Sequence, residues 1–257
     1  MQYLSEVEHY VPPEELAIIE LKSRIQNVEY VLETEIIGYE EIRKLILKII
    51  NAGINKPELK RINLLLTGEK STGKTAIFKA MEKGLGLDNC IYYDASMATR
   101  VGLLDHLYSY GEILSKYIIF DEIDKMSKQH QYGILNCLEA GIMKENKFHR
   151  HREVDVRGST FFGSANEIKY VYPPLRSRFL TLNMPKYTPE QFDMIGHKLL
   201  TRMGVDYYII DEIMEVIDKE LPDKTIRDVV RLGTLVDTME DVTDITALFQ
   251  RHRLNFD

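Results

Sequence analysis

Residues 64–75 read Leu-Leu-Leu-Thr-Gly-Glu-Lys-Ser-Thr-Gly-Lys-Thr, and this stretch decides the fold. Its apolar beginning, from Leu64 to Leu66, is typical of a buried parallel strand. Gly68, four further residues and then Gly73, Lys74 and Thr75 complete the pattern of a phosphate-binding loop that opens a helix. A strand, loop and helix in this order predict an α/β fold in which helices flank a parallel sheet.

Each residue type in the loop has a physical reason. Gly68 and Gly73 allow the backbone to turn tightly and to aim successive N–H groups at phosphate oxygens. We expect Lys74 to reach the β- and γ-phosphates and the Thr75 hydroxyl to coordinate Mg²⁺. A plain glycine-rich turn is the alternative, which the full pattern disfavours. The predicted nucleotide contacts are Gly68, Glu69, Lys70, Ser71, Thr72, Gly73, Lys74, Thr75 and Ala76.

Composition places the chain among globular proteins. It has 257 residues, of which 44% are apolar and 28% charged, and its net charge of −7 gives no global basic field that would announce nucleic acid. Only two cysteines occur, which favours a reducing compartment over a disulfide framework. The beginning of the chain lacks the features of a signal peptide, and no apolar run approaches the roughly 20 residues of a membrane helix. We therefore expect a cytoplasmic location and no membrane partner.

A second short strand is expected at residues 90–93, and a third, Tyr117 to Phe120, is followed directly by Asp121 and Glu122. A carboxylate at the end of a parallel strand lies at the carboxyl edge of the sheet, where ligands bind in open α/β folds. We expect Asp121 to hold Mg²⁺, mostly through water, and Glu122 to polarise the attacking water as general base. An isolated Asp-Glu pair is weak support, but after a phosphate-binding loop it predicts a hydrolytic site.

Two later segments supply candidates for the same edge. A strand within residues 157–166 ends in Asn166, whose amide can orient water or bond a γ-phosphate oxygen, unless it only forms a turn. Arg176 and Arg178 follow a Pro-Pro pair. An arginine placed on a γ-phosphate neutralises charge that develops during phosphoryl transfer. The alternative for these two arginines is a pair of surface salt bridges.

The main local basic patch lies in residues 144–152, an insert with two histidines, one acid and four fixed positive charges. The four are Lys144, Lys147, Arg150 and Arg152. We predict that they contact DNA or RNA phosphates, and the alternative is a solvated β-hairpin tip.

Helical patterns account for the remaining chain. An arm of helical spacing begins within residues 11–15 and runs to about residue 33, either on its own domain or on a neighbouring subunit, and an amphipathic helix follows at 40–52. A helix is also expected at 102–114. From residue 185 onward only helices are expected, at 189–203, 208–220, 226–238 and 242–251, which predicts a small bundle. The predicted domains are an arm (1–35), a nucleotide domain (36–183) and a helical lid (184–257).

The motifs together resemble the AAA+ ATPase family over residues 36–238. The resemblance rests on the phosphate-binding loop, Ile-Ile-Phe-Asp-Glu at 118–122, Ser-Ala-Asn at 164–166, Leu-Arg-Ser-Arg-Phe at 175–179, and a helical lid that carries Arg227. Within the family the chain is most similar to RuvB-like Holliday-junction branch-migration motors and to clamp-loader ATPases. Two differences stand out: RuvB-like proteins have threonine where this chain has Asn166, and we expect no winged-helix domain after the lid.

The resemblance implies ATP and Mg²⁺ as cofactors and a homo-oligomeric, hexameric ring. It implies that Asn166 senses the γ-phosphate, that Arg178 or Arg176 is an arginine finger used in trans, and that Arg227 is a second sensor. It also places Ile37 and Gly38 near the adenine.

The implied function is ATP hydrolysis coupled to remodelling of DNA, with a partner protein as a further possibility. One alternative is a protein-remodelling chaperone, which the missing aromatic in residues 96–101 disfavours. The other alternative is a slowly hydrolysing, nucleotide-gated assembly subunit.

Overall fold

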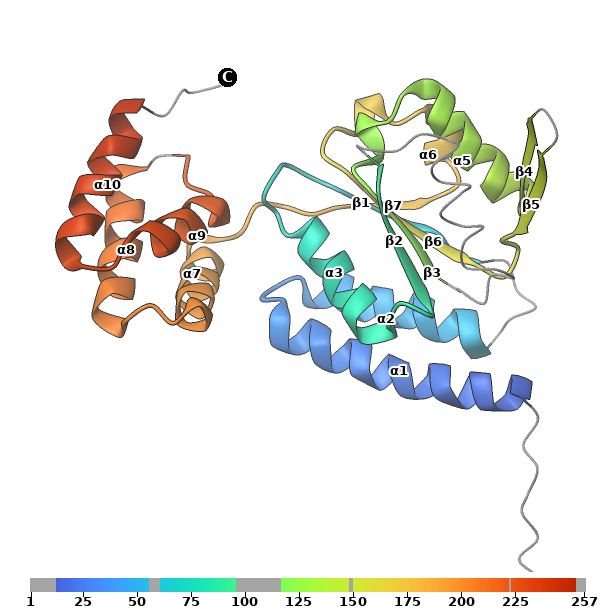
Figure 1. Cartoon of the computed structure of the whole chain (residues 1–257), viewed down its shortest axis with the longest axis horizontal. Coiled ribbons are helices and arrows are strands. Elements are labelled where there is room, and N and C mark those ends of the chain that lie inside the picture. The colour runs from blue at the N-terminus through green and yellow to red at the C-terminus, as the bar shows by residue number, and fades with distance from the viewer. Residues whose placement is uncertain (1–12, 56–60, 96–116, 148–149, 222, 253–257) are drawn as a thin grey trace, which may run out of the picture. The chain divides into compact units, whose positions relative to one another are not determined.

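The computed structural model describes residues 13–55, 61–95, 117–147, 150–221 and 223–252 (Figure 1). Contacts between Cα atoms divide the chain into two compact units. The first contains residues up to 68 and 73–184, and the second contains residues from 185 together with 69–72. Within the second unit, the Glu69 carboxylate pairs with Lys186 at 2.8 Å.

The first unit is built on a five-stranded parallel sheet with the strand order β2-β3-β6-β1-β7. The fold class predicted from the sequence is therefore confirmed. Strand β6 lies between β1 and β3, and its register pairs Ala165 with Thr67 and Gly163 with Phe120. The carboxyl ends of these three strands consequently meet at one edge. The strands are β1 (Leu64–Thr67), β2 (Cys90–Asp94), β3 (Tyr117–Asp121), β6 (Thr160–Ala165) and β7 (Leu180–Asn183).

Helices cover both faces of this sheet (Figure 1). One face carries α1 (Pro13–Glu35), α2 (Glu40–Asn55) and α3 (Lys74–Leu85), and the other carries α5 (Lys128–Ala140) and the short α6 (Pro173–Arg176). Leu64 and Leu66 pack into the core on the first face and Leu65 into the core on the second. Burial on both faces explains why the central strand is apolar at each of these positions.

Helix α1 packs closely on α3 and belongs to the first unit. A Cβ added at Gly84 would lie 2.6 Å from Cα of Val28, so only glycine permits this approach. Of the two positions considered for the N-terminal arm, the described part therefore lies on its own domain. Helix α3 runs through Gly84 to Leu85, and the N–H of the following Gly86, which has a φ of 81°, donates to the Glu82 carbonyl.

The insert forms an antiparallel hairpin of β4 (Ile142–Lys147) and β5 (Arg150–Asp155), in which Lys147 pairs with Arg150. The two strands thus have the hairpin form that the alternative interpretation named, which by itself does not decide whether the insert contacts phosphates. The side chains of the four basic residues and the tip at 148–149 lie outside the described residues, as does the helix expected at 102–114, so those predictions remain untested.

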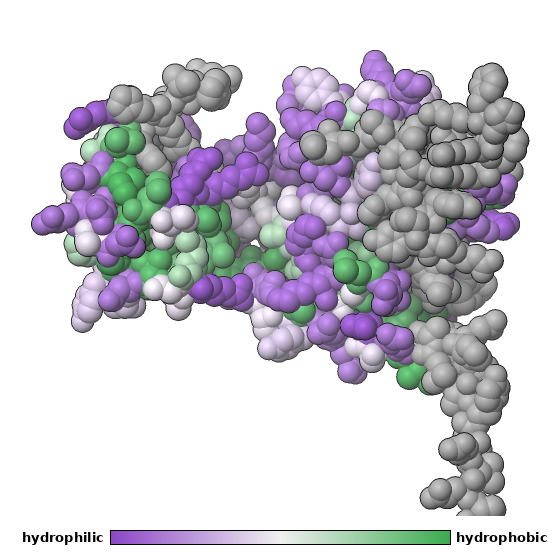
Figure 2. All heavy atoms as spheres, viewed as in Figure 1, coloured by the Kyte–Doolittle hydropathy of each residue, from purple (hydrophilic) through white to green (hydrophobic). Residues whose placement is uncertain are grey.

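The second unit contains four helices in its described part: α7 (Pro189–Met203), α8 (Tyr207–Glu220), α9 (Ile226–Leu235) and α10 (Met239–His252). Helix α9 ends before the expected Thr238, because residues just after it form the cap of α10. The Thr238 hydroxyl donates to the Asp241 carboxylate at 2.7 Å, and the Asp241 N–H donates back to that hydroxyl at 3.3 Å. Figure 2 shows hydrophobic residues gathered on the face of this unit that is turned to the viewer.

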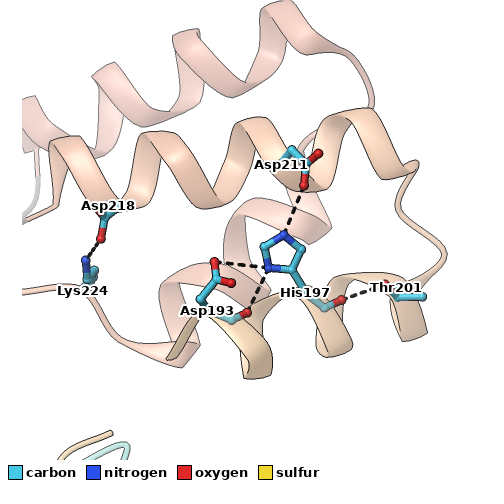
Figure 3. Close-up of polar contacts among 6 residues, drawn as sticks. All are labelled: Asp193, His197, Thr201, Asp211, Asp218 and Lys224. Atoms are coloured by element: carbon cyan, nitrogen blue, oxygen red, sulfur yellow. Dashed lines mark hydrogen bonds and ion pairs between the residues drawn. The ribbon is translucent and has the colours of Figure 1, made fainter. Parts of the chain in front are cut away.

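A histidine links two helices of this unit (Figure 3). His197 of α7 has Nδ1 3.0 Å from the Asp193 carbonyl oxygen and Nε2 3.2 Å from Oδ1 of Asp211 on α8. Partial burial of the ring favours the neutral imidazole, but the hydrogen bonds and charges of the two aspartates outweigh it. The pKa of His197 therefore lies above its usual value.

Candidate functional site

The phosphate-binding loop has the backbone that its glycines predict. Gly68 has φ 147°, and a Cβ at this position would lie 2.4 Å from the carbonyl oxygen of Met184. Gly73 and Ser71 are also left-handed, with φ of 89° and 64°. Lys74 is buried, and its Nζ donates to the Gly68 carbonyl at 2.7 Å. The loop thus leaves no room for a side chain where it turns, and its lysine ammonium lies beside its first residue.

Three hydroxyl groups converge on the carboxylate of Asp121, which is only 4% exposed at the end of β3. Thr75 donates to Oδ2 at 2.7 Å and Tyr92 donates to the same oxygen at 2.5 Å. Ser164 donates to Oδ1. Hydrogen bonds to an ionised acceptor are stronger than those between neutral groups. The carboxylate is therefore held in one orientation by donors from α3, β2 and β6.

Glu122 has an unusual backbone. Its φ of 59° and ψ of 47° are left-handed, which is uncommon for a residue other than glycine. Its N–H donates to the Ser164 hydroxyl at 2.8 Å, and its Oε1 accepts from Nδ2 of Asn166 at 3.2 Å. Strained backbone of this kind concentrates at functional sites, where the surrounding contacts over-determine it. Asp121, Glu122 and Asn166 lie together at the sheet edge, where the sequence places them.

Two residues of this cluster were not predicted from the sequence. Ser164 lies in the Ser-Ala-Asn motif, but only the amide at its end indicated a site. Tyr92 lies in a short apolar strand and carried no signal. Its pKa is raised by burial and by its bond to Asp121, so the hydroxyl stays protonated as a donor. The contacts of both residues with Asp121 arise because their strands are neighbours of β3 in the sheet, although they are distant from it in sequence.

The predicted arginine-finger candidates lie exposed beyond β6. The Arg178 guanidinium forms an ion pair with Glu139 of α5, with Nε 3.2 Å from Oε1. Arg176 has no ion pair within the part of the chain that the structure describes. An exposed pair of this kind contributes about 0–1 kcal/mol and is easily exchanged for another partner.

Three further predicted residues make no hydrogen bond or ion pair with Asp121, Glu122 or Asn166 among the described residues, and each is described within its own unit. Arg227 is exposed in the first turn of α9, in the second unit. Gly38 is buried with φ 74°, beside the half-buried Ile37. The predicted roles of these residues and of the two arginines remain predictions.

The chemistry of the cluster fits Mg²⁺ and a phosphate chain. Hydroxyl and carboxylate oxygens, here from Thr75 and Asp121, are the hard ligands that Mg²⁺ uses beside nucleotide phosphates. A glycine loop at the beginning of α3 directs backbone N–H groups and the positive end of the helix toward a bound phosphate. The cysteines offer no competing chemistry, because Cys90 and Cys137 are buried and burial raises the pKa of the Cys137 thiol to about 12.

The parallel sheet, the loop and the adjacent carboxylates define a P-loop nucleoside triphosphatase. Residues 64–184 match the model of the ATPase family associated with various cellular activities (AAA), so this part of the chain is an AAA ATPase domain. The fold is RuvB-like: a mutant of Thermotoga maritima RuvB superimposes with a TM-score of 0.62 and 19% identity, covering 84% of this chain and 72% of that one. Thermotoga maritima RuvB Holliday junction branch migration motor gives 0.58 and 21%, covering 86% and 71%.

Curated proteins with similar sequences are named Lon proteases. The Lon protease homolog of Acanthamoeba polyphaga mimivirus is 24% identical over 246 residues, which cover 84% of this chain and 24% of that protein. The peroxisomal Lon protease homolog 2 of Kluyveromyces lactis is 28% identical over 192 residues, covering 64% and 19%. The chain thus spans about a quarter or less of these relatives' length. None of the described helices combines the length and apolar character needed to cross a membrane.

Proposed function

We propose that this chain hydrolyses ATP with Mg²⁺ in a homo-oligomeric ring and uses the energy to remodel a macromolecule. The observation that supports hydrolysis most directly is the arrangement of two adjacent carboxylates, each held differently. Among the described residues, Asp121 accepts three hydroxyl donors, whereas the Glu122 side chain accepts a single amide bond from Asn166. The first is held rigidly and the second keeps acceptor capacity for a water molecule.

The residues divide the work as follows. Lys74 and the loop N–H groups bind the phosphates, and Thr75 and Asp121 hold Mg²⁺, which when bound neutralises charge on the β- and γ-phosphates. Glu122 accepts a proton from the attacking water. Asn166 keeps the Glu122 carboxylate in place through the 3.2 Å bond.

A direct test compares Glu122→Gln with the unchanged chain. The glutamine keeps the size of the side chain but cannot accept a proton, so ATP binding should persist while hydrolysis falls to background. Lys74→Ala is the matched binding variant and should weaken ATP binding itself. Hydrolysis by Glu122→Gln at the unchanged rate would refute the assignment of the base.

The ring is proposed because the arginines lie in a segment that the family resemblance places on a neighbour's nucleotide. A finger supplied in trans is worth about 10³–10⁵ in rate. Arg178→Ala should then bind ATP but hydrolyse it poorly, and mixing it with Lys74→Ala should restore part of the activity. Glu139→Ala is the matched control, because it removes the same ion pair and leaves the guanidinium in place.

The macromolecule proposed first is DNA, on the basis of the β4–β5 hairpin. Four basic residues lie on two short paired strands in a chain of net charge −7. If they contact phosphates, DNA affinity should fall steeply with salt, and replacing all four with serine should flatten that slope while basal hydrolysis persists.

The second candidate is protein remodelling, which the similarity to Lon proteases favours. Stimulation of ATP hydrolysis by duplex or branched DNA, compared with stimulation by an unfolded protein such as reduced casein, separates the two. Absence of DNA binding by the unchanged chain at low salt would refute the first candidate. Stimulation by casein alone would favour the second.

A further inference from the structure

One hydroxyl reaches the metal-holding carboxylate from outside the sequence motifs. Tyr92 of β2 donates to Oδ2 of Asp121 at 2.5 Å, the oxygen that also accepts from Thr75. Strand register produces this contact: Tyr92 pairs with Ile119 of β3, two residues before Asp121. Alternate residues of a strand share a face, so Tyr92, Ile119 and Asp121 lie on the same side of the sheet.

The ring of Tyr92 is held by the helix that follows the phosphate-binding loop. Nζ of Lys79 on α3 lies 3.4 Å from the centre of the ring, a cation–π contact. The ring is half-buried and packs against the core between α3 and the sheet. Because α3 begins with Lys74 and Thr75, one helix positions both hydroxyls that meet at Asp121 Oδ2.

Among the described residues, the hydroxyl contacts leave one oxygen of Asp121 with spare acceptor capacity. A carboxylate offers about four acceptor sites, two on each oxygen. Thr75 and Tyr92 fill those of Oδ2, and Ser164 fills one on Oδ1. A water molecule bound to Mg²⁺ can therefore hydrogen-bond Oδ1 without displacing any of the three donors.

We propose that Tyr92 is a positioning residue for Mg²⁺, because its hydroxyl occupies Oδ2 of Asp121 and directs metal-bound water to Oδ1. This inference rests on the proposed role of Thr75 and Asp121 in holding Mg²⁺ beside the bound nucleotide. Residues that orient a metal-holding group are typically worth about 10–100-fold in metal affinity or activity when they are removed.

Tyr92→Phe tests the inference because it removes one oxygen and keeps the ring over which Lys79 lies. Binding of a fluorescent ADP analogue is titrated in EDTA and then against Mg²⁺. In EDTA the affinity should be unchanged, whereas the Mg²⁺ concentration for half-maximal effect should rise by about 10–100-fold. Tyr93→Phe is the matched control, since Tyr93 lies next along β2 and packs on the opposite face, against Phe120. Its Mg²⁺ dependence should match that of the unchanged chain.

A second arm uses Asp121→Asn. If Tyr92 acts through this carboxylate, Tyr92→Phe should change Mg²⁺ affinity no further when it is added to Asp121→Asn. Equal Mg²⁺ dependence in Tyr92→Phe and Tyr93→Phe would overturn the inference. Equal loss of affinity in EDTA and in Mg²⁺, or failure of Tyr92→Phe alone to fold, would also overturn it by showing a structural role. Nucleotide binding by the unchanged chain without any Mg²⁺ dependence would instead refute the proposed Mg²⁺ site of Thr75 and Asp121, on which the proposed function depends.

Discussion

The left-handed backbone of Glu122 is expected to lower the free energy of unfolding, and glycine at this position should relieve the backbone strain. Its backbone is left-handed, with φ 59° and ψ 47°. That conformation costs an L-residue roughly 1–2 kcal/mol, while glycine adopts it freely. Glycine in turn loses roughly 0.5–1 kcal/mol more backbone entropy on folding. Glu122→Gly should therefore be more stable than Glu122→Ala by about 0.5–1 kcal/mol.

The comparison with alanine isolates the contribution of the backbone conformation to stability, because both variants lose the side-chain hydrogen bond to Asn166. Neither should hydrolyse ATP. The exposed Asn136, inside helix α5, provides the opposite control, since glycine in a helix is about 1 kcal/mol less stable than alanine. Free energies of unfolding from urea titration of the four variants test both signs. If Glu122→Gly were no more stable than Glu122→Ala while the Asn136 variants behaved as expected, the strain argument would fail.

Ser164→Ala should destabilise the first unit by about 2–4 kcal/mol and slow hydrolysis, because it leaves the Asp121 carboxylate oxygen and the Glu122 N–H without their shared hydrogen-bond partner. Urea unfolding and ATPase assays measure the two effects. Gly84→Ala should cost about 1–3 kcal/mol, since the new methyl group would meet Cα of Val28, and thermal unfolding should show a lowered midpoint. Protonated His197 should stabilise the second unit below its unfolded pKa near 6.5, and this contribution should disappear as pH rises through the higher folded pKa. Urea unfolding at several pH values from 5.5 to 8 should show this pH dependence in the unchanged chain and not in His197→Ala. A free energy of unfolding that does not vary with pH in the unchanged chain would contradict the role of Asp211.

Several parts of the fold were predictable because their causes are local. The phosphate-binding loop follows from glycine spacing, and the loop backbone has the left-handed residues that this spacing requires at Gly68 and Gly73. Helix α7 has the bounds expected from the sequence, Pro189 to Met203; it begins after Thr188, whose hydroxyl accepts from the Gln191 N–H, and ends before the left-handed Gly204. Neighbouring residues carry these signals, so one sequence is enough to read them.

The candidate site was predictable only in part. The positions of Asp121, Glu122 and Asn166 at strand ends follow from the rule that parallel strands meet at their carboxyl edge. The donors Ser164 and Tyr92 could not be predicted, because each bond depends on which strands are neighbours. The left-handed backbone of Glu122 was also missed, since glutamate has no preference for that conformation and only the surrounding contacts hold it there.

The sequence by itself determined the nucleotide-binding class of the domain, the residues of its loop and the helical character of the second unit. Tertiary structure decided that β6 lies between β1 and β3, and hence that Ser164 bridges Asp121 and Glu122. It also decided that Tyr92 is part of the site and that α1 packs closely against α3 at Gly84. The physical reason is that helix periodicity and turn chemistry act over a few residues, whereas strand order and close packing depend on which distant surfaces bury one another most completely.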